Sequence, residues 1–167
     1  MRKDTKRLTF LALGVALAMI LSFVESQIPP LAAVPGVKIG LSNIVTVAMI
    51  YIYGWRDAAF ISLVRISLSA LLFGNAFALI YSFSGAVLSF VTMLIAKRFL
   101  PFGIIGVSVI GGVMHNAGQI AAAAIVMENT AISLYMIPLV ISGTLAGVAV
   151  GVLSGIITYR LRRVVKK

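Results

Sequence analysis

The sequence contains no cysteine, a single histidine and only four acidic residues. The absence of cysteine excludes a disulfide framework and a thiolate metal site. The acids are Asp4, Glu25, Asp57 and Glu128. They are far apart in the chain, whereas metal-dependent diphosphate chemistry requires clustered carboxylates to hold Mg²⁺. A lone histidine is also too little for a zinc site or, without an acid at its depth, for a Ser–His–Asp triad. The sequence therefore argues against an enzyme and predicts neither a metal nor a cofactor.

Polar residues are scarce as well. The 167 residues are 61% hydrophobic, against ~45–50% in ordinary soluble domains, and the mean hydropathy is +1.12. The net charge of +10 comes largely from the two ends of the chain, through Arg2, Lys3, Lys6, Arg7, Arg160, Arg162, Arg163, Lys166 and Lys167. Basic ends that flank apolar segments are typical of a protein oriented in a bilayer. We therefore expect lipid as a partner and no nucleic acid.

Turn residues and charges divide the chain into six apolar segments. They cover about residues 8–25, 38–54, 58–74, 77–96, 103–126 and 133–159. Because a bilayer-spanning helix needs ~17–25 residues, this pattern predicts a single all-α domain over residues 1–167 with six transmembrane helices. An even number of spans places both termini on one side of the membrane. With the termini in the cytoplasm, twelve cations lie inside and only Lys38 lies outside, which satisfies the positive-inside rule.

Small residues mark two predicted helices as packing surfaces. In the last segment Gly143, Gly147, Gly151 and Gly155 recur every four residues, and such a smooth stripe lets a second helix approach closely. The stripe is compatible with packing inside this bundle, and also with a dimer seam or a sliding surface. The first segment contains a weaker small-xxx-small pair, Ala12 and Ala16.

Arg65 is the most informative residue, because it is a lone cation in the middle of the third apolar segment. Counting from Asp57 at ~1.5 Å per residue places it about 12 Å into the bilayer. An arginine at that depth costs from ~3 to more than ~10 kcal/mol. The charge therefore requires a partner side chain, a wet cavity or an anionic ligand. One interpretation is ligand contact, and the other is a staple in which Arg65 pairs with Glu25 or with backbone carbonyls.

Other polar residues are predicted at similar depths or above them. His115 and Gln119 are four residues apart on one helix face, with Asn116 on the adjacent row. Further candidates near the outer face are Asn43, Asn75 and Ser82. We expect a polar cavity that opens outward, is roofed by the proline-rich residues 29–35 and has Glu25 and Lys38 at its rim. As alternatives, His115 is satisfied by a helix neighbour and Lys38 snorkels to the interface. Two cations and a histidine facing one acid favour an anionic ligand.

Several short motifs resemble the Gx transporter family, whose members are often labelled heptaprenyl diphosphate synthase component I. The motifs are Glu25-Ser26-Gln27-Ile28-Pro29, Pro35-Gly36-Val37-Lys38-Ile39-Gly40-Leu41-Ser42-Asn43, Leu63-Val64-Arg65, Gly74-Asn75, Ser82-Phe83-Ser84-Gly85 and His115-Asn116-Ala117-Gly118-Gln119. The resemblance spans about residues 10–155. It implies a protein similar to the six-helix S components of energy-coupling-factor transporters, which capture vitamins for a coupling subunit and two ATPases. It also implies that Ala12 and Ala16 dock the coupling subunit.

We therefore expect a multi-pass subunit of a bacterial cytoplasmic membrane that captures a small, anionic vitamin or cofactor precursor. Any ATPase must be a separate chain, because no G-x-x-x-x-G-K-S/T motif occurs. Arg65 would anchor the charge. The other expected ligand contacts are Asn43, His115, Asn116, Gln119, Glu25, Lys38, Asn75 and Ser82. The alternatives are a non-catalytic accessory subunit in isoprenoid, quinone or electron-transfer metabolism, and a solitary proton-coupled carrier in which His115 titrates.

Overall fold

The computed structural model describes residues 3–28 and 40–165. Within these ranges the chain forms six α-helices and one 3₁₀ helix: α1 (Lys3–Ser26), α2 (Asn43–Ile52), α3 (Trp55–Phe73), α4 (Ala76–Phe99), α5 (Ile104–Val126), η1 (Thr130–Tyr135) and α6 (Met136–Val165). The described residues contain no strand, so the all-helical fold class is confirmed. Lys38 and the expected roof over residues 29–35 lie outside the described residues.

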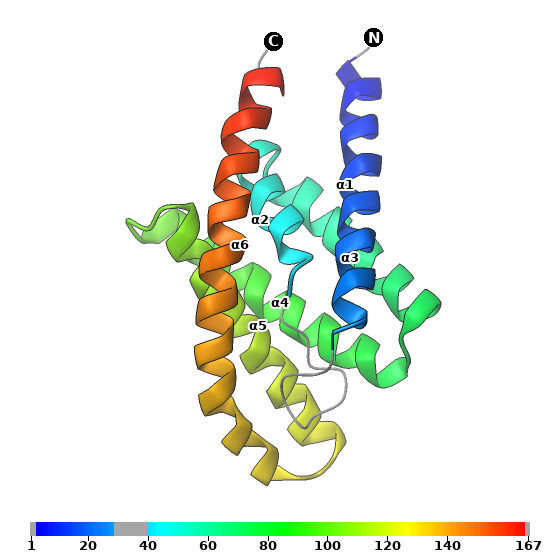
Figure 1. The fold of residues 1–167 in the computed structure, drawn as a ribbon, viewed down its shortest axis with the longest axis vertical. Helices are drawn as coiled ribbons and strands as arrows, with labels where there is room; N and C mark the ends of the chain where they lie inside the picture. Colours follow the sequence, from blue (N-terminus) through cyan, green and yellow to red (C-terminus); the bar gives the residue numbers. More distant parts are fainter. Residues whose placement is uncertain (1–2, 29–39, 166–167) are drawn as a thin grey trace.

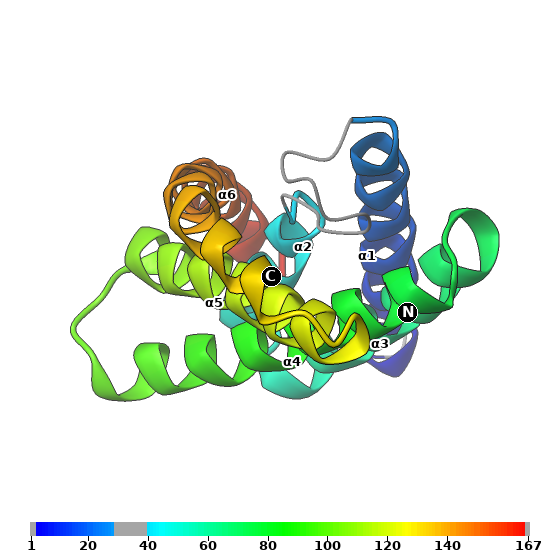
Figure 2. The same ribbon diagram turned by 90° about the horizontal axis from the view of Figure 1, so that it is seen from below.

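The helices form two layers. α1, α2 and α6 make one layer, with α2 between the two long helices, and α3, α4 and α5 make the other (Figure 2). The strongest contacts join α5 to α6 and to α4, while α1 packs mainly on α3. α1 and α6 run in opposite directions, so the two ends of the chain lie at the same end of the molecule (Figure 1). This arrangement agrees with an even number of crossings.

Four helical stretches are long and apolar enough to cross a bilayer. They are Thr5–Ser26, Ala76–Phe99, Ile104–Val126 and Thr130–Arg163, so the chain has the character of a multi-pass membrane protein. α3 is 19 residues long, but it carries Arg56, Asp57 and Arg65. α2 has ten residues and rises about 15 Å, half of the ~30 Å hydrocarbon core. Six complete spans therefore stay a prediction.

The second helix is shorter than the expected segment over residues 38–54, because glycines in unusual conformations flank it. Gly40 and Gly54 have φ angles of +90° and +101°, a region that glycine adopts without strain and that interrupts an α-helix. Between them, α2 is buried over eight of its residues, from Asn43 to Ile50. The hydropathy pattern detects the apolar run over residues 38–54, but it does not detect the glycine conformations that interrupt the helix.

The carbonyl end of α2 is satisfied by cations from two other helices. Lys97 of α4 donates its Nζ proton to the carbonyl of Ile50 at 2.7 Å and lies over the Tyr51 ring. Arg162 of α6 donates from Nη2 to the carbonyl of Tyr51 at 2.7 Å. These contacts supply partners for carbonyls that a helix leaves unpaired, and they place positive charge at the negative end of its dipole. A half-length helix can therefore end inside the bundle.

The glycine stripe of α6 faces α5 of the same chain. A Cβ atom placed on Gly147 would lie 2.6 Å from the Cα of Val109, and one on Gly151 would lie 2.7 Å from the Cα of Ile105. Gly143 meets Gly112 in the same way, whereas nothing lies within 4 Å of a Cβ on Gly155. The α5–α6 backbones approach so closely that only hydrogen fits at these points.

Candidate functional site

Arg65 is buried on α3 and only partly satisfied. Its side chain is 5% exposed, and Nη1 donates to the hydroxyl oxygen of Ser22 on α1 at 3.3 Å. Glu25, one turn further along α1, acts electrostatically on the guanidinium. Nε and Nη2 have no hydrogen-bond partner within the described part of the chain. Within the described residues, one edge of the guanidinium therefore has two donors without a partner.

A small hollow adjoins this guanidinium. It is lined by Arg65, Ser69 and Gly74 on the α3 side and by Ala78 and Ser82 of α4. Its volume is about 10 Å³, which is room for about one water molecule. The expected roof lies outside the described residues, so a wider cavity that opens outward stays a prediction.

A second polar group surrounds the backbone of Gly40, just before α2. The carboxylate of Glu25 accepts hydrogen bonds from the amide of Gly40 and from the amide of Leu41, the latter at 3.4 Å. A Cβ atom on Gly40 would lie 2.9 Å from Nδ2 of Asn43 and 3.8 Å from Cδ2 of His115. Glu25, Asn43 and His115 are all buried. Helices α1, α2 and α5 thus bring three of the predicted residues together at one glycine.

The polar residues of α5 face two different neighbours. A Cβ atom on Gly85 of α4 would lie 2.7 Å from Cγ of Gln119 and 3.2 Å from Cε1 of His115, so these two side chains lie against α4. Asn116 instead donates from Nδ2 to the carbonyl of Leu139 on α6 at 2.8 Å. Its Oδ1 is buried without a hydrogen-bond partner among the described residues.

The remaining predicted residues have different surroundings. Asn75 is exposed, and its Oδ1 accepts from the amide of Ala78 at 2.8 Å, so its visible role is to cap α4. Ala12 and Ala16 are exposed on the outer side of α1. Ser82 is half-buried and shares the hollow with Arg65.

Neither Ser22, the partner of Arg65, nor the position of Gly40 among the polar residues was predicted from the sequence. Ser22 precedes Glu25 by three residues, a spacing that puts both on one helix face, and this signal could have identified the partner of Arg65. Gly40 lies inside the longest recognised motif, but nothing in that motif shows that residues of α1, α2 and α5 meet near its backbone. Tertiary packing alone supplies that information.

The described acids have separate environments. Asp57 is buried at the start of α3 and forms an ion pair with Nε and Nη2 of Arg7 on α1. Glu25 lies at Gly40, and Glu128 is exposed after α5. No group of three or more His, Cys, Asp or Glu side chains gathers within residues 3–28 and 40–165. The candidate polar sites of this part of the chain combine a single carboxylate, that of Glu25, with guanidinium, amide, hydroxyl and imidazole groups.

Apolar helices around buried polar groups define a multi-pass membrane protein with an internal polar site. The chain matches the family model described as heptaprenyl diphosphate synthase component I over residues 15–157, and it belongs to that family. No curated protein and no solved structure matches it significantly.

Proposed function

We propose that this protein is the substrate-binding membrane subunit of an uptake system, similar to an S component, which takes up a small anionic vitamin or cofactor precursor. Separate ATPases and a coupling subunit would supply the energy. The observation that carries the proposal is the open edge of Arg65, where Nε and Nη2 are buried without a hydrogen-bond partner among the described residues. A buried donor left unsatisfied costs about 1–3 kcal/mol. A bound anion would remove that cost.

The open edge also indicates the shape of the ligand. Nε and Nη2 lie side by side and donate in parallel, which suits the two oxygens of a carboxylate or a phosphate. Arg7 uses the same two atoms to hold the carboxylate of Asp57. By this analogy Arg65 would take a carboxylate or phosphate group of the substrate, with Ser69 and Ser82 beside it.

The remaining predicted residues would complete the site above the hollow. Asn43, His115, Asn116 and Gln119 would offer hydrogen bonds to the body of the substrate, with Asn116 contributing its open Oδ1. Glu25, Lys38 and Asn75 would lie toward the mouth. Ala12 and Ala16 would dock the coupling subunit, because they are exposed on an outer helix and small enough for a close helix approach. In this proposal the termini face the cytoplasm of a bacterium.

A second function is favoured by the family description. As a component of a prenyl diphosphate synthase, the protein would be a non-catalytic membrane subunit that assists a soluble partner. The scattered acids argue against a catalytic role of its own, because Mg²⁺-diphosphate chemistry needs several carboxylates at one place.

Purification in mild detergent separates the two functions. If the chain is an uptake subunit, mass spectrometry of the complex will find an ATPase, a membrane coupling subunit and a small carboxylate or phosphate compound. If it is a synthase component, a soluble prenyl synthase will copurify and the small anion will be absent. Copurification of the synthase alone would refute the uptake proposal.

A further inference from the structure

An apolar groove runs between α3 and α4 on the outside of the bundle. Its volume is about 190 Å³, and its walls include Ala59, Ser62 and Ile66 of α3 and Phe83, Val87 and Val91 of α4. Phe83, Val87 and Val91 are nearly half exposed, so the groove is open along its side. In a multi-pass membrane protein such a groove opens into the lipid.

The groove leads to a cationic corner. The start of α3 and the end of α4 enclose an open space of about 570 Å³ lined by Trp55, Leu94, Lys97 and Arg98. Arg98 is exposed, and Arg56 lies next to the corner, over the Trp55 ring at 5.3 Å. No acidic residue lines this space, and Asp57, the nearest acid in the chain, is paired with Arg7. The corner therefore attracts negative charge.

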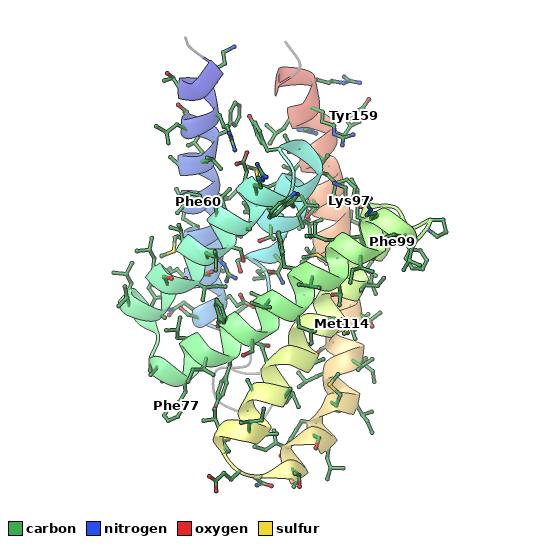
Figure 3. All side chains as sticks on the ribbon, turned by 180° about the vertical axis from the view of Figure 1, so that it is seen from behind. Phe60, Phe77, Lys97, Phe99, Met114 and Tyr159 are labelled. Atoms are coloured by element: carbon green, nitrogen blue, oxygen red, sulfur yellow. The ribbon has the colours of Figure 1, made fainter. Side chains whose placement is uncertain are left out.

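The two parts follow α4, and together they have about the length of one phospholipid. From Phe83 to Val91 the groove follows α4 for about 12 Å, and Arg98 lies about 10 Å further along. The sum of about 22 Å along the helix axis matches the length of one phospholipid, which is half the thickness of a bilayer with its headgroups (~40–45 Å). Figure 3 shows this face, with Lys97 nearer the end that carries both termini and Phe77 at the opposite end. Tryptophan, lysine and arginine are the side chains that proteins place at headgroup level.

We infer that the α3–α4 groove is a binding site for one anionic phospholipid of the surrounding bilayer. The acyl chain lies along Ala59 and Val87, and the phosphate lies at Lys97 and Arg98. Apolar side chains alone would accept any lipid tail, whereas an unbalanced cationic corner selects an anionic headgroup. This site goes beyond solute capture. Ile66 forms a wall of both the groove and the hollow beside Arg65, so the lipid tail lies next to the polar site without entering it.

Trp55 allows a direct test, because it is the only tryptophan in the chain and it lines the corner. The purified full-length protein is reconstituted into vesicles with phospholipids brominated near the headgroup end of the acyl chain, either phosphatidylglycerol or phosphatidylcholine. Bromine quenches tryptophan fluorescence at contact. We expect phosphatidylglycerol to quench at a lower mole fraction, with about fivefold tighter binding for each cation that contributes. Equal quenching by the two lipids would overturn the inference.

Two substitutions locate the lipid. Arg98→Gln should reduce the preference for phosphatidylglycerol about fivefold, whereas Arg160→Gln, the same charge change at an exposed position of α6, should leave it unchanged. Ala59→Leu fills the apolar groove and should weaken quenching by both lipids. Unchanged preference in Arg98→Gln, or unchanged quenching in Ala59→Leu, would contradict the placement of the headgroup or of the tail.

Competition identifies the source of the phosphate. Unbrominated phosphatidylglycerol should restore the fluorescence, and dissolved glycerol phosphate should not. Restoration by glycerol phosphate would show a site for free phosphate instead. Restoration by farnesyl diphosphate at a lower mole fraction than phosphatidylglycerol would show an isoprenoid occupant, and it would refute the phospholipid assignment.

Discussion

If Arg65 holds an anion, we expect Arg65→Met to abolish retention of that anion and to leave the fold at least as stable as the wild type. The substitution removes the two open donors, each worth about 1.5–3 kcal/mol to a charged acceptor, so affinity should fall at least a hundredfold. Methionine fills a similar volume, and it removes both the desolvation cost of the buried guanidinium and its two donors without a partner among the described residues. Glu25 keeps its bonds to the amides of Gly40 and Leu41. The measurements are mass spectrometry of the copurifying anion and thermal unfolding in detergent.

Arg56→Met is the matched control, because it is the same substitution on the same helix at an exposed position. It should retain the anion at the level of the wild type. If Arg65 is only a staple between helices, Arg65→Met should lower the stability of the fold and should not affect the binding of any anion. In that case the variant would unfold at a much lower temperature, and no small anion would copurify with the wild type either.

Gly147→Ala destabilises the bundle, while Gly155→Ala on the same helix stabilises it slightly. The added Cβ at Gly147 would meet the Cα of Val109 at 2.6 Å, a backbone contact that only a separation of α5 from α6 relieves. Overpacking of this kind costs typically ~1–3 kcal/mol. Nothing lies within 4 Å of a Cβ at Gly155, so alanine should there contribute its helix propensity, up to ~1 kcal/mol. Unfolding by denaturing detergent measures both effects.

Light scattering of the same two variants tests the alternative role of the glycine stripe. If the stripe were a dimer seam, Gly147→Ala would change the mass of the particle and leave the unfolding of the protomer almost unchanged. Packing inside one bundle predicts that Gly147→Ala leaves the mass of the particle unchanged and makes the protomer unfold more easily.

Hydropathy predicted the long helices well and their ends less well. The described α1 begins at Lys3 and α6 ends at Val165, beyond the expected bounds at residues 8 and 159. Lysine and arginine are good helix formers, so the helices continue past the apolar run that enters the membrane. The shortening of α2 has the opposite cause, because Gly40 and Gly54 interrupt the backbone inside an apolar run.

Counting depth from the helix ends predicted that buried polar residues would concentrate within the bundle, but depth does not give direction around the helix axis. His115 and Asn116 are adjacent in the sequence, yet His115 lies against α4 while Asn116 bonds to α6. Ser82 shares the hollow of Arg65, whereas Asn43 lies at Gly40. Glu25 and Ser22, one turn apart on α1, connect the two groups. Such directions depend on which helices pack together, and the sequence of one chain does not state this.

We propose that the guanidinium of Arg65 borders a water-filled space that is reached from outside the cell. Because the chain has no cysteine, a single Ser82→Cys substitution places one thiol in the hollow beside Arg65. Ser89→Cys, two turns further along α4 and buried, is the matched control. We expect a membrane-impermeant thiol reagent added outside intact cells to modify the Ser82→Cys protein and to leave the Ser89→Cys protein unmodified. Modification of the Ser82→Cys protein only from the cytoplasmic side, or only by a lipid-soluble reagent, would show that no water-filled space beside Arg65 opens to the outside.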